Sequence, residues 1–320
     1  ADPLHEHRSW CRTIMQRYLT YRAVQSLVTL LAISVIIFGL SRLSGSPVDA
    51  LLPDNATPQE AAVLIHEWGL DRPLHVQYLA FVRNAVRGNL GDSLKWPGET
   101  ALGMVWQRLP ATLQLGGFAI IISTLIAIPI GVLAAVHKGR LFDSFGKMIA
   151  LLGQAMPPFW LGIMLIWIFS VHWNVFPTSG RGGFEHMVLP AIAMGWYQVA
   201  ALMRLTRSST LEVLDAEYIK LARLKGVPEW RVIWVHALRN AAIAPLTYFG
   251  VIVGYIFTGS VVIETVFAWP GTGLLAIEAI RARDYPVVQA VVLTFAVVFI
   301  LANLIVDILY AFVDPRIRYK

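Results

Sequence analysis

The chain alternates long apolar stretches with shorter segments that carry most of its charges. Six stretches are nearly free of charge over the roughly 20 residues that a helix needs to cross a hydrocarbon core of about 30 Å. They predict membrane-spanning helices at residues 23–43, 111–136, 149–171, 187–207, 241–263 and 287–310. A shorter apolar stretch, residues 265–277, contains Trp269-Pro270-Gly271 and predicts an interfacial or re-entrant turn.

Composition leads to the same class of protein. Of the 320 residues, 57% are hydrophobic and 14% are charged, whereas an average soluble domain has roughly 25% charged residues. We therefore expect an all-α membrane protein, because helices satisfy their own backbone hydrogen bonds in lipid. The single cysteine, Cys11, excludes a disulfide within the chain.

Lysine and arginine gather in alternate polar segments. They are frequent at the N-terminus, between the second and third predicted spans, between the fourth and fifth, and at the C-terminus. By the positive-inside rule, both termini are predicted to be cytoplasmic. This asymmetry, together with anionic lipid and a cytoplasmic partner, explains the net charge of +6 without a nucleic-acid partner.

The arginine-rich start also fits a cleavable signal peptide. A membrane span is the favoured interpretation, because the apolar run exceeds 7–15 residues and Ser44-Gly45-Ser46 offers no Ala-x-Ala site. The chain begins Ala1-Asp2-Pro3, and these residues are assigned no role. The predicted organisation is a cytoplasmic segment 1–22, a first span 23–43, an extracytoplasmic loop 44–108, a core 109–313 with a polar segment 208–240, and a cytoplasmic tail 314–320.

The first outer loop is long enough to fold by itself. Thr57-Pro58-Gln59-Glu60 has the signature of a helix start and predicts a helix from Thr57 to about Trp68. Apolar positions from Leu70 to Val82 predict a second amphipathic helix, before a Gly88-Asn89-Leu90-Gly91 turn. Such a subdomain suits a lid on the outer helix ends or a receptor-docking surface, and both roles can hold at once.

The polar segment between the fourth and fifth spans is rich in basic residues. Gly226-Val227-Pro228 splits it into two short amphipathic helices, and Gly226 suits a left-handed cap. Ala222 and Gly226, four residues apart, allow a partner to approach closely, while Lys220, Arg223 and Lys225 can meet its carboxylates. The alternative is a basic helix that lies on anionic lipid.

Several motifs occur in order along the chain. Ala222-Arg223-Leu224-Lys225-Gly226 is followed by His236-Ala237-Leu238-Arg239-Asn240. Further motifs are Leu70-Asp71-Arg72-Pro73-Leu74, Leu109-Pro110-Ala111-Thr112-Leu113, Arg204-Leu205-Thr206-Arg207-Ser208, Phe267-Ala268-Trp269-Pro270-Gly271, Arg283-Asp284-Tyr285-Pro286-Val287 and Asp314-Pro315-Arg316-Ile317-Arg318-Tyr319. From about Met15 to Lys320, the chain resembles the peptide and nickel branch of ABC importer permeases, specifically the first of their two permease subunits.

That resemblance implies a type I ABC importer permease fold with six transmembrane helices and a folded extracytoplasmic loop between helices 1 and 2. It implies a bacterial inner (plasma) membrane location, a second homologous permease, two ATP-binding subunits and an extracytoplasmic solute-binding protein. It also implies alternating access driven by ATPases docked on a coupling helix. The implied coupling residues are Tyr218, Leu221, Ala222, Arg223, Lys225, Gly226, His236, Leu238 and Arg239.

No catalytic or cofactor-binding residues are expected in this chain. ATP and Mg²⁺ should bind the partner ATPases, because the only Gly-Lys pair, Gly146-Lys147, is followed by Met148 and makes no phosphate loop. The eight histidines show no i, i+4 pair, so no metal site is predicted. An intramembrane hydrolase would need paired catalytic groups within the spans, and none is found.

Polar residues within the spans are few. Gly250 and Gly254 predict close helix packing, and the candidate solute-path residues are Gln154, Gln198, Tyr248, Tyr255, Thr258 and Glu264. Asp307 is interpreted as a structural partner for an arginine near the cytoplasmic surface. Arg204 and Arg207 are expected to extend toward lipid headgroups.

The solute is the open question. Short peptides, as dipeptides or oligopeptides, are the first expectation from the resemblance. Nickel or a metal chelate, glutathione and other small amide-containing solutes are alternatives in the same class of importer. A more distant alternative, an ion-coupled secondary carrier, would be expected to show internal repeats and buried carboxylates.

Overall fold

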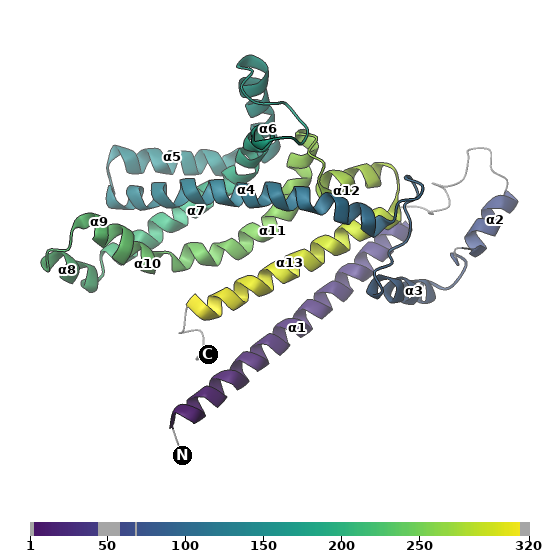
Figure 1. Ribbon diagram of the computed structural model, residues 1–320, viewed down its shortest axis with the longest axis horizontal. Coiled ribbons are helices and arrows are strands. Elements are labelled where there is room, and N and C mark those ends of the chain that lie inside the picture. Colours follow the sequence, from purple (N-terminus) through teal and green to yellow (C-terminus); the bar gives the residue numbers. More distant parts are fainter. Residues whose placement is uncertain (1–2, 44–57, 68, 314–320) are drawn as a thin grey trace. The chain divides into compact units, whose positions relative to one another are not determined.

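The computed structural model describes residues 3–43, 58–67 and 69–313 (Figure 1). Within these residues the regular structure is helical, apart from an isolated bridge between Asp92 and Thr100. The helices are α1 (Pro3–Leu43), α2 (Pro58–Glu67), α3 (Leu74–Val86), α4 (Ala101–Val136), α5 (Leu141–Ala155), α6 (Pro158–Leu165), the π-helical η2 (Ile166–His172), α7 (Phe184–Leu214), α8 (Glu217–Leu224), α9 (Glu229–Arg231), the π-helical η3 (Val232–Ala237), α10 (Leu238–Ala241), α11 (Ile243–Val266), α12 (Thr272–Arg281) and α13 (Tyr285–Val313).

Four of the described helices are individually long and apolar enough to cross a membrane: Thr20–Leu43 of α1, α4, α7, and Tyr285–Ile305 of α13. Two bent pairs pass the same test together. These are α5 with α6 and η2, bent by 105°, and Glu229–Ala241 with Ile243–Ile256, bent by 52°. The described chain therefore has four candidate spans, or up to six if each bent pair counts as one.

The third predicted span differs from the expectation of one helix over 149–171. Two helices meet there at a sharp bend, because Pro157 and Pro158 cannot donate backbone hydrogen bonds to a preceding turn. The residue before them, Met156, has an extended backbone with φ −86° and ψ 124°. A residue that precedes proline is disfavoured in the helical region, so α5 ends at this position.

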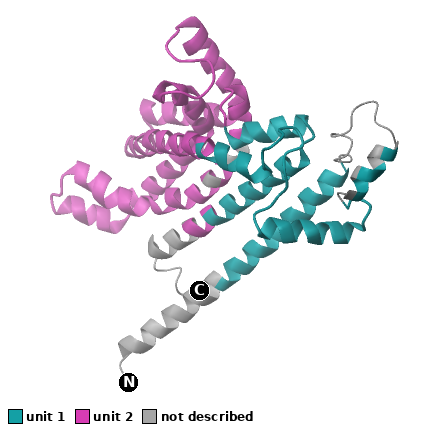
Figure 2. Ribbon diagram, turned by 45° about the vertical axis from the view of Figure 1, so that its right-hand side comes forward, with its two compact units in different colours: residues 1–110, 271–301 teal, residues 111–270, 302–320 magenta. Residues whose placement is uncertain are grey.

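The chain divides into two compact units (Figure 2). Unit 1 consists of residues 1–110 and 271–301. Its core joins the first turns of α4 to α12 and α13, through Ala101, Met104, Val105, Leu275, Ala279, Val287, Ala290 and Val291. In the same unit, Phe38 of α1 contacts Tyr78 and Phe81 of α3, with ring centroids 5.5 and 5.7 Å apart.

Asp284 organises the loop that precedes α4. Its buried carboxylate accepts hydrogen bonds from the Ser93 hydroxyl and from the backbone N–H groups of Leu94 and Lys95, at 3.0 and 3.1 Å. Its other oxygen accepts a bond from the N–H of Val287 in the first turn of α13, at 3.3 Å. One side chain thus caps α13 and holds the loop against it.

The outer loop contains two helices among its described residues. The structure has α2 at Pro58–Glu67 and α3 at Leu74–Val86, close to the two amphipathic helices that the pattern predicts. The predicted helix ends, Thr57 and Trp68, lie outside the described residues.

Unit 2 consists of residues 111–270 and 302–320, and α7 is its central helix. Helix α7 packs against α5, α6 and α11. Of its most apolar stretch of 18 residues, 67% is buried. Glycines also allow a close approach of α7 to α4. A side chain at Gly131 would come within 2.7 Å of the Met203 carbonyl oxygen, and one at Gly195 within 3.0 Å of the Ala119 carbonyl oxygen. The glycines singled out from the sequence, Gly250 and Gly254, are half-buried, and their role in packing stays a prediction.

The apolar stretch 265–277 is a tight turn followed by a helix. Helix α11 ends at Val266, and Ala268 adopts a left-handed conformation with φ 46°. The next residue, Trp269, is fully buried in unit 2, where its indole N–H donates to the Ala111 carbonyl at 3.0 Å. The turn therefore has fixed internal contacts, and α12 begins three residues later.

Candidate functional site

The polar segment forms a compact helical projection at one end of α7 and α11 (Figure 1). Helix α7 ends at Leu214 and α8 begins at Glu217, so only two residues separate them. Ile219 of α8 is buried against Val232 and Ala237 of the returning η3, with Val213, Leu214, Ala222 and Val227 packed around them. Helix α8 is therefore packed directly on η3 and on the end of α7.

Gly226 reverses the chain after α8. Its φ of +75° lies in the left-handed region, as the sequence predicts, and a Cβ atom there would meet no atom within 4 Å. Its N–H bonds the Arg223 carbonyl, and the N–H of Val227 bonds the Ala222 carbonyl. Glycine at this position is thus required by backbone conformation and not by lack of space.

The outward face of the projection combines apolar and charged groups. Tyr218, Leu221, Leu224 and Trp230 are exposed, with Leu224 reaching 85%. Ala222 faces the other way and packs on the Ile219 cluster, so the close approach expected at Ala222 occurs within the chain. Exposed large apolar side chains in such a group are typical of a surface that binds another protein.

Two of the basic side chains have acidic partners within the projection. Lys220 pairs with Glu217 at 2.8 Å, and Arg223 pairs with Glu229 at 2.7 Å. These hydrogen-bonded carboxylates raise the pKa of Lys220 and of Arg223 above their ordinary values, so both stay charged. Among the described residues, Lys225 forms no ion pair and is exposed.

The second motif of this segment lies on η3 and α10. His236 and Arg239 are exposed, Leu238 is half-buried, and the His236 carbonyl accepts a hydrogen bond from Asn240 at 3.1 Å. The structure thus brings all nine predicted coupling residues into one projection. Whether they bind an ATPase stays a prediction.

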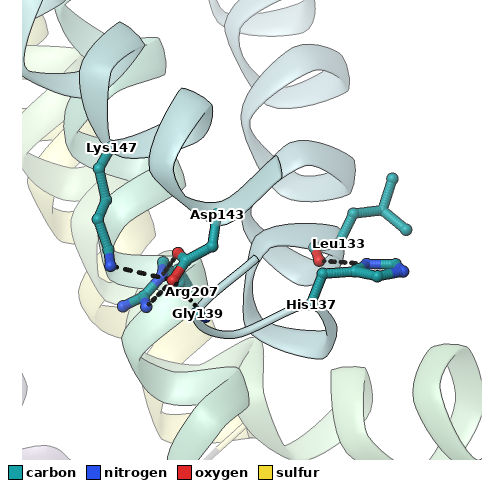
Figure 3. A network of polar contacts seen from close by, with 6 residues as sticks. All are labelled: Leu133, His137, Gly139, Asp143, Lys147 and Arg207. Atoms are coloured by element: carbon teal, nitrogen blue, oxygen red, sulfur yellow. Dashed lines mark hydrogen bonds and ion pairs between the residues drawn. The ribbon is translucent and has the colours of Figure 1, made fainter. Parts of the chain in front are cut away.

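A buried carboxylate connects the start of α5 to α7 (Figure 3). Asp143 has no exposed side-chain surface and accepts two bonds from Arg207, at 2.6 and 3.0 Å. It also accepts a bond from the Gly139 N–H and pairs with Lys147, each at 3.0 Å. Arg207 is therefore held inside the protein, where the sequence predicts an extension toward lipid. Asp143 was not among the residues that the sequence singled out.

Arg204 also has a protein partner. Its Nη1 donates to the Oε1 of Gln154, a predicted solute-path residue at the end of α5, at 3.0 Å. Two more of these residues, Tyr248 and Tyr255, lie on α11, and Tyr255 stacks on Tyr197 of α7 with ring centroids 5.4 Å apart. The structure thus joins Gln154 to Arg204 and Tyr255 to Tyr197, and Tyr248 lies two turns from Tyr255 on α11.

The other predicted solute-path residues lie elsewhere. Glu264 is fully buried and accepts a hydrogen bond from the Thr112 hydroxyl at 2.6 Å. Gln198 is buried on a different face of α7 from Arg204. The side chains of Thr258 and Asp307 lie outside the described part of the chain.

These features define a class of protein: a helical membrane protein with an exposed, partly apolar projection and a few polar groups on its long apolar helices. The chain belongs to the family described as binding-protein-dependent transport system inner membrane component, whose model matches residues 127–319. A companion model for the N-terminal part of such membrane components matches residues 15–116. The predicted relationship to importer permeases is thereby confirmed.

Curated relatives match along nearly the whole chain. The dipeptide transport system permease protein DppB of Escherichia coli K12 is 40% identical over 343 residues, which is 96% of this chain and 100% of that protein. The di/tripeptide permease DppB of Pseudomonas aeruginosa is 39% identical over 340 residues, with the same coverage. The glutathione permease GsiC of Salmonella typhimurium is 38% identical over 307 residues, also covering 96% of this chain and 100% of that protein.

Proposed function

We propose that this chain is the permease subunit of an ATP-driven importer of short peptides. With a second, homologous permease it would form the translocation path through the bacterial inner membrane. The observation that carries this proposal is the full-length 40% identity to a dipeptide permease. The exposed apolar projection around α8 supports it, because an importer needs such a surface to receive a soluble motor.

The proposed mechanism is alternating access. Two ATP-binding subunits, which hold ATP and Mg²⁺, would dock on the face formed by Tyr218, Leu221 and Leu224. Their closure would push α8, and the Ile219 cluster would pass that movement to α7 and η3. An extracytoplasmic binding protein would deliver the solute, and the ATP chemistry would take place on the partners.

The proposed orientation places both chain termini and the projection on the cytoplasmic side. The distribution of lysine and arginine supports this, since 137–147 and the projection are both rich in basic residues. The loop with α2 and α3 would then face the binding protein.

Glutathione import is the second candidate. It is favoured by the 38% identity to a glutathione permease over the same share of the chain. Both solutes contain peptide bonds and free carboxylates, so one path chemistry serves either. Nickel or metal-chelate import stays an alternative within the same class, and an ion-coupled carrier is the alternative outside it.

The test is purification of the tagged chain from native membranes, followed by uptake in liposomes. We expect recovery of a second permease and of two ATP-binding subunits, with dipeptide uptake that requires ATP. Uptake of glutathione but not of dipeptides would select the second candidate. Uptake driven by an ion gradient without ATP would refute the importer.

A further inference from the structure

Polar side chains form a stripe along two neighbouring helices. Tyr197 and Arg204 on α7 are seven residues apart, as are Tyr248 and Tyr255 on α11, and seven residues are close to two full helical turns. Each pair therefore shares one face of its helix. Tyr197 stacks on Tyr255, so the two faces meet. Together with Gln154, these four residues are called the path stripe.

Arg204 contacts α5 far from the charged start of that helix. Its partner Gln154 lies on α5 about 16 Å from Asp143, at 1.5 Å per residue. Asp143 binds Arg207, which is less than one turn from Arg204 on α7. Side chains on a helix point toward its N-terminus, and Arg204 follows that direction away from the end of α7. Its guanidinium group is thus held well inside the span.

The charge of Arg204 has little compensation from its own chain. Gln154 is neutral, and no carboxylate in the described residues forms an ion pair with Arg204. The C-terminal end of α5 supplies a partial negative charge of at most about half a unit. The arginine side chain is nevertheless exposed. A charge within a span costs about 2.5–3.5 kcal/mol against lipid, so such residues face water-filled paths or bind a partner.

We infer that Arg204, with Gln154 and Tyr248, binds the free carboxylate of a solute as it passes through the permease. The inference rests on the proposed function and names the chemical group that the path recognises. A guanidinium offers five N–H donors, of which Gln154 uses one, so a planar carboxylate can take two of the others. Tyr248, on the same face of α11 as Tyr255, supplies another O–H donor on the stripe.

The rest of the stripe suits variable side chains. Tyr197 and Tyr255 present half-buried aromatic rings about 10 Å along the helices from the Arg204 level, at 1.5 Å per residue. Aromatic faces contact apolar and polar groups alike. The path would thus bind a group that all unmodified peptides share and tolerate the side chains that differ between them.

The test compares two probes that differ only in the recognised group. The complete importer is reconstituted in liposomes, and ATP-dependent uptake of dialanine and of dialanine amide is measured with the binding protein at saturation for each probe. We expect Arg204→Gln to slow dialanine uptake at least tenfold, the loss of about one charge-assisted interaction, and to change amide uptake less than twofold. Arg204→Lys should retain an intermediate rate for dialanine.

A matched control is Arg140→Gln, which removes the same charge from an exposed arginine outside the spans. It should leave uptake of both probes and basal ATP hydrolysis unchanged. Equal slowing of both probes by Arg204→Gln, or no slowing of either, overturns the inference. Loss of the second permease from the purified variant would also overturn it, since Arg204 would then bind a subunit and not a solute. Absence of ATP-dependent uptake by the unaltered complex would instead refute the peptide-import proposal, and the inference with it.

Discussion

Replacing Asp143 with asparagine tests the joint between α5 and α7. The carboxylate is fully buried and is bound by Arg207, Lys147 and the Gly139 N–H. Removing one partner of a fully buried ion pair costs about 3–5 kcal/mol, and an exposed pair contributes about 0–1 kcal/mol. Because the side chain of Arg207 is 20% exposed, water partly screens this pair. We therefore expect a loss of about 2–3 kcal/mol.

The assay is a double-mutant cycle on the purified complex in detergent. Unfolding is followed for the unaltered protein, Asp143→Ala, Arg207→Ala and the double variant, with Asp143→Asn alongside. The coupling energy should exceed about 1 kcal/mol, because the two groups contact each other directly. Lys147→Gln is the control, since its side chain is 53% exposed and should contribute under about 1 kcal/mol.

A functional consequence should accompany the loss of stability. Helix α7 leads into α8 after two residues, so a loosened joint lets α8 move without the rest of the unit. Asp143→Asn should then hydrolyse more ATP for each solute molecule imported. Additive effects in the cycle, together with an unchanged ratio of ATP to solute, would show that the ion pair neither stabilises the joint nor transmits movement.

Three other substitutions test separate contacts. Gly226→Ala should cost about 1 kcal/mol through left-handed strain, measured by thermal unfolding, while Gly226→Asn should cost less. Leu224→Asp should lower the recovery of the ATP-binding subunits with the chain at least tenfold, without destabilising the chain. The same change at Leu141, which is similarly exposed, should leave that recovery unchanged. Thr112→Val should cost about 1–3 kcal/mol, because buried Glu264 loses a donor, and Thr112→Ser should restore most of it. A variant whose unfolding or subunit recovery matches that of the unaltered protein would contradict the contact that its substitution tests.

The long helices were predictable from the length of the apolar runs alone. An apolar run of 20 or more residues has few alternatives to a helix in lipid, and the second, fourth and sixth predicted stretches lie within α4, α7 and α13. The bend in the third was harder to place. Pro157-Pro158 breaks a helix in either case, and a kinked span and two helices at 105° have the same sequence signature. The choice between them depends on what packs around the break.

The side-chain contacts of the candidate site join residues that are far apart in the sequence. Asp143 sits in a charged stretch and resembles a solvated surface residue, and nothing local connects it to Arg207, 64 residues away. Its position in the first turn of α5, four residues before Lys147, was the available signal. The seven-residue spacing of Tyr197 with Arg204, and of Tyr248 with Tyr255, was equally present in the sequence. Only the packing of α7 on α11 made it a stripe.

The break at Met156 has a consequence for the biogenesis of this subunit. Helix α5 has 15 residues, about 22 Å, which is too short to cross a core of about 30 Å. Its last carbonyls would therefore stop within the bilayer, and lipid cannot satisfy them. A copy made without a companion would expose both this helix end and Arg204 to acyl chains. The cellular level of this chain should thus follow that of its companion, since a surplus copy would be a substrate for membrane quality control.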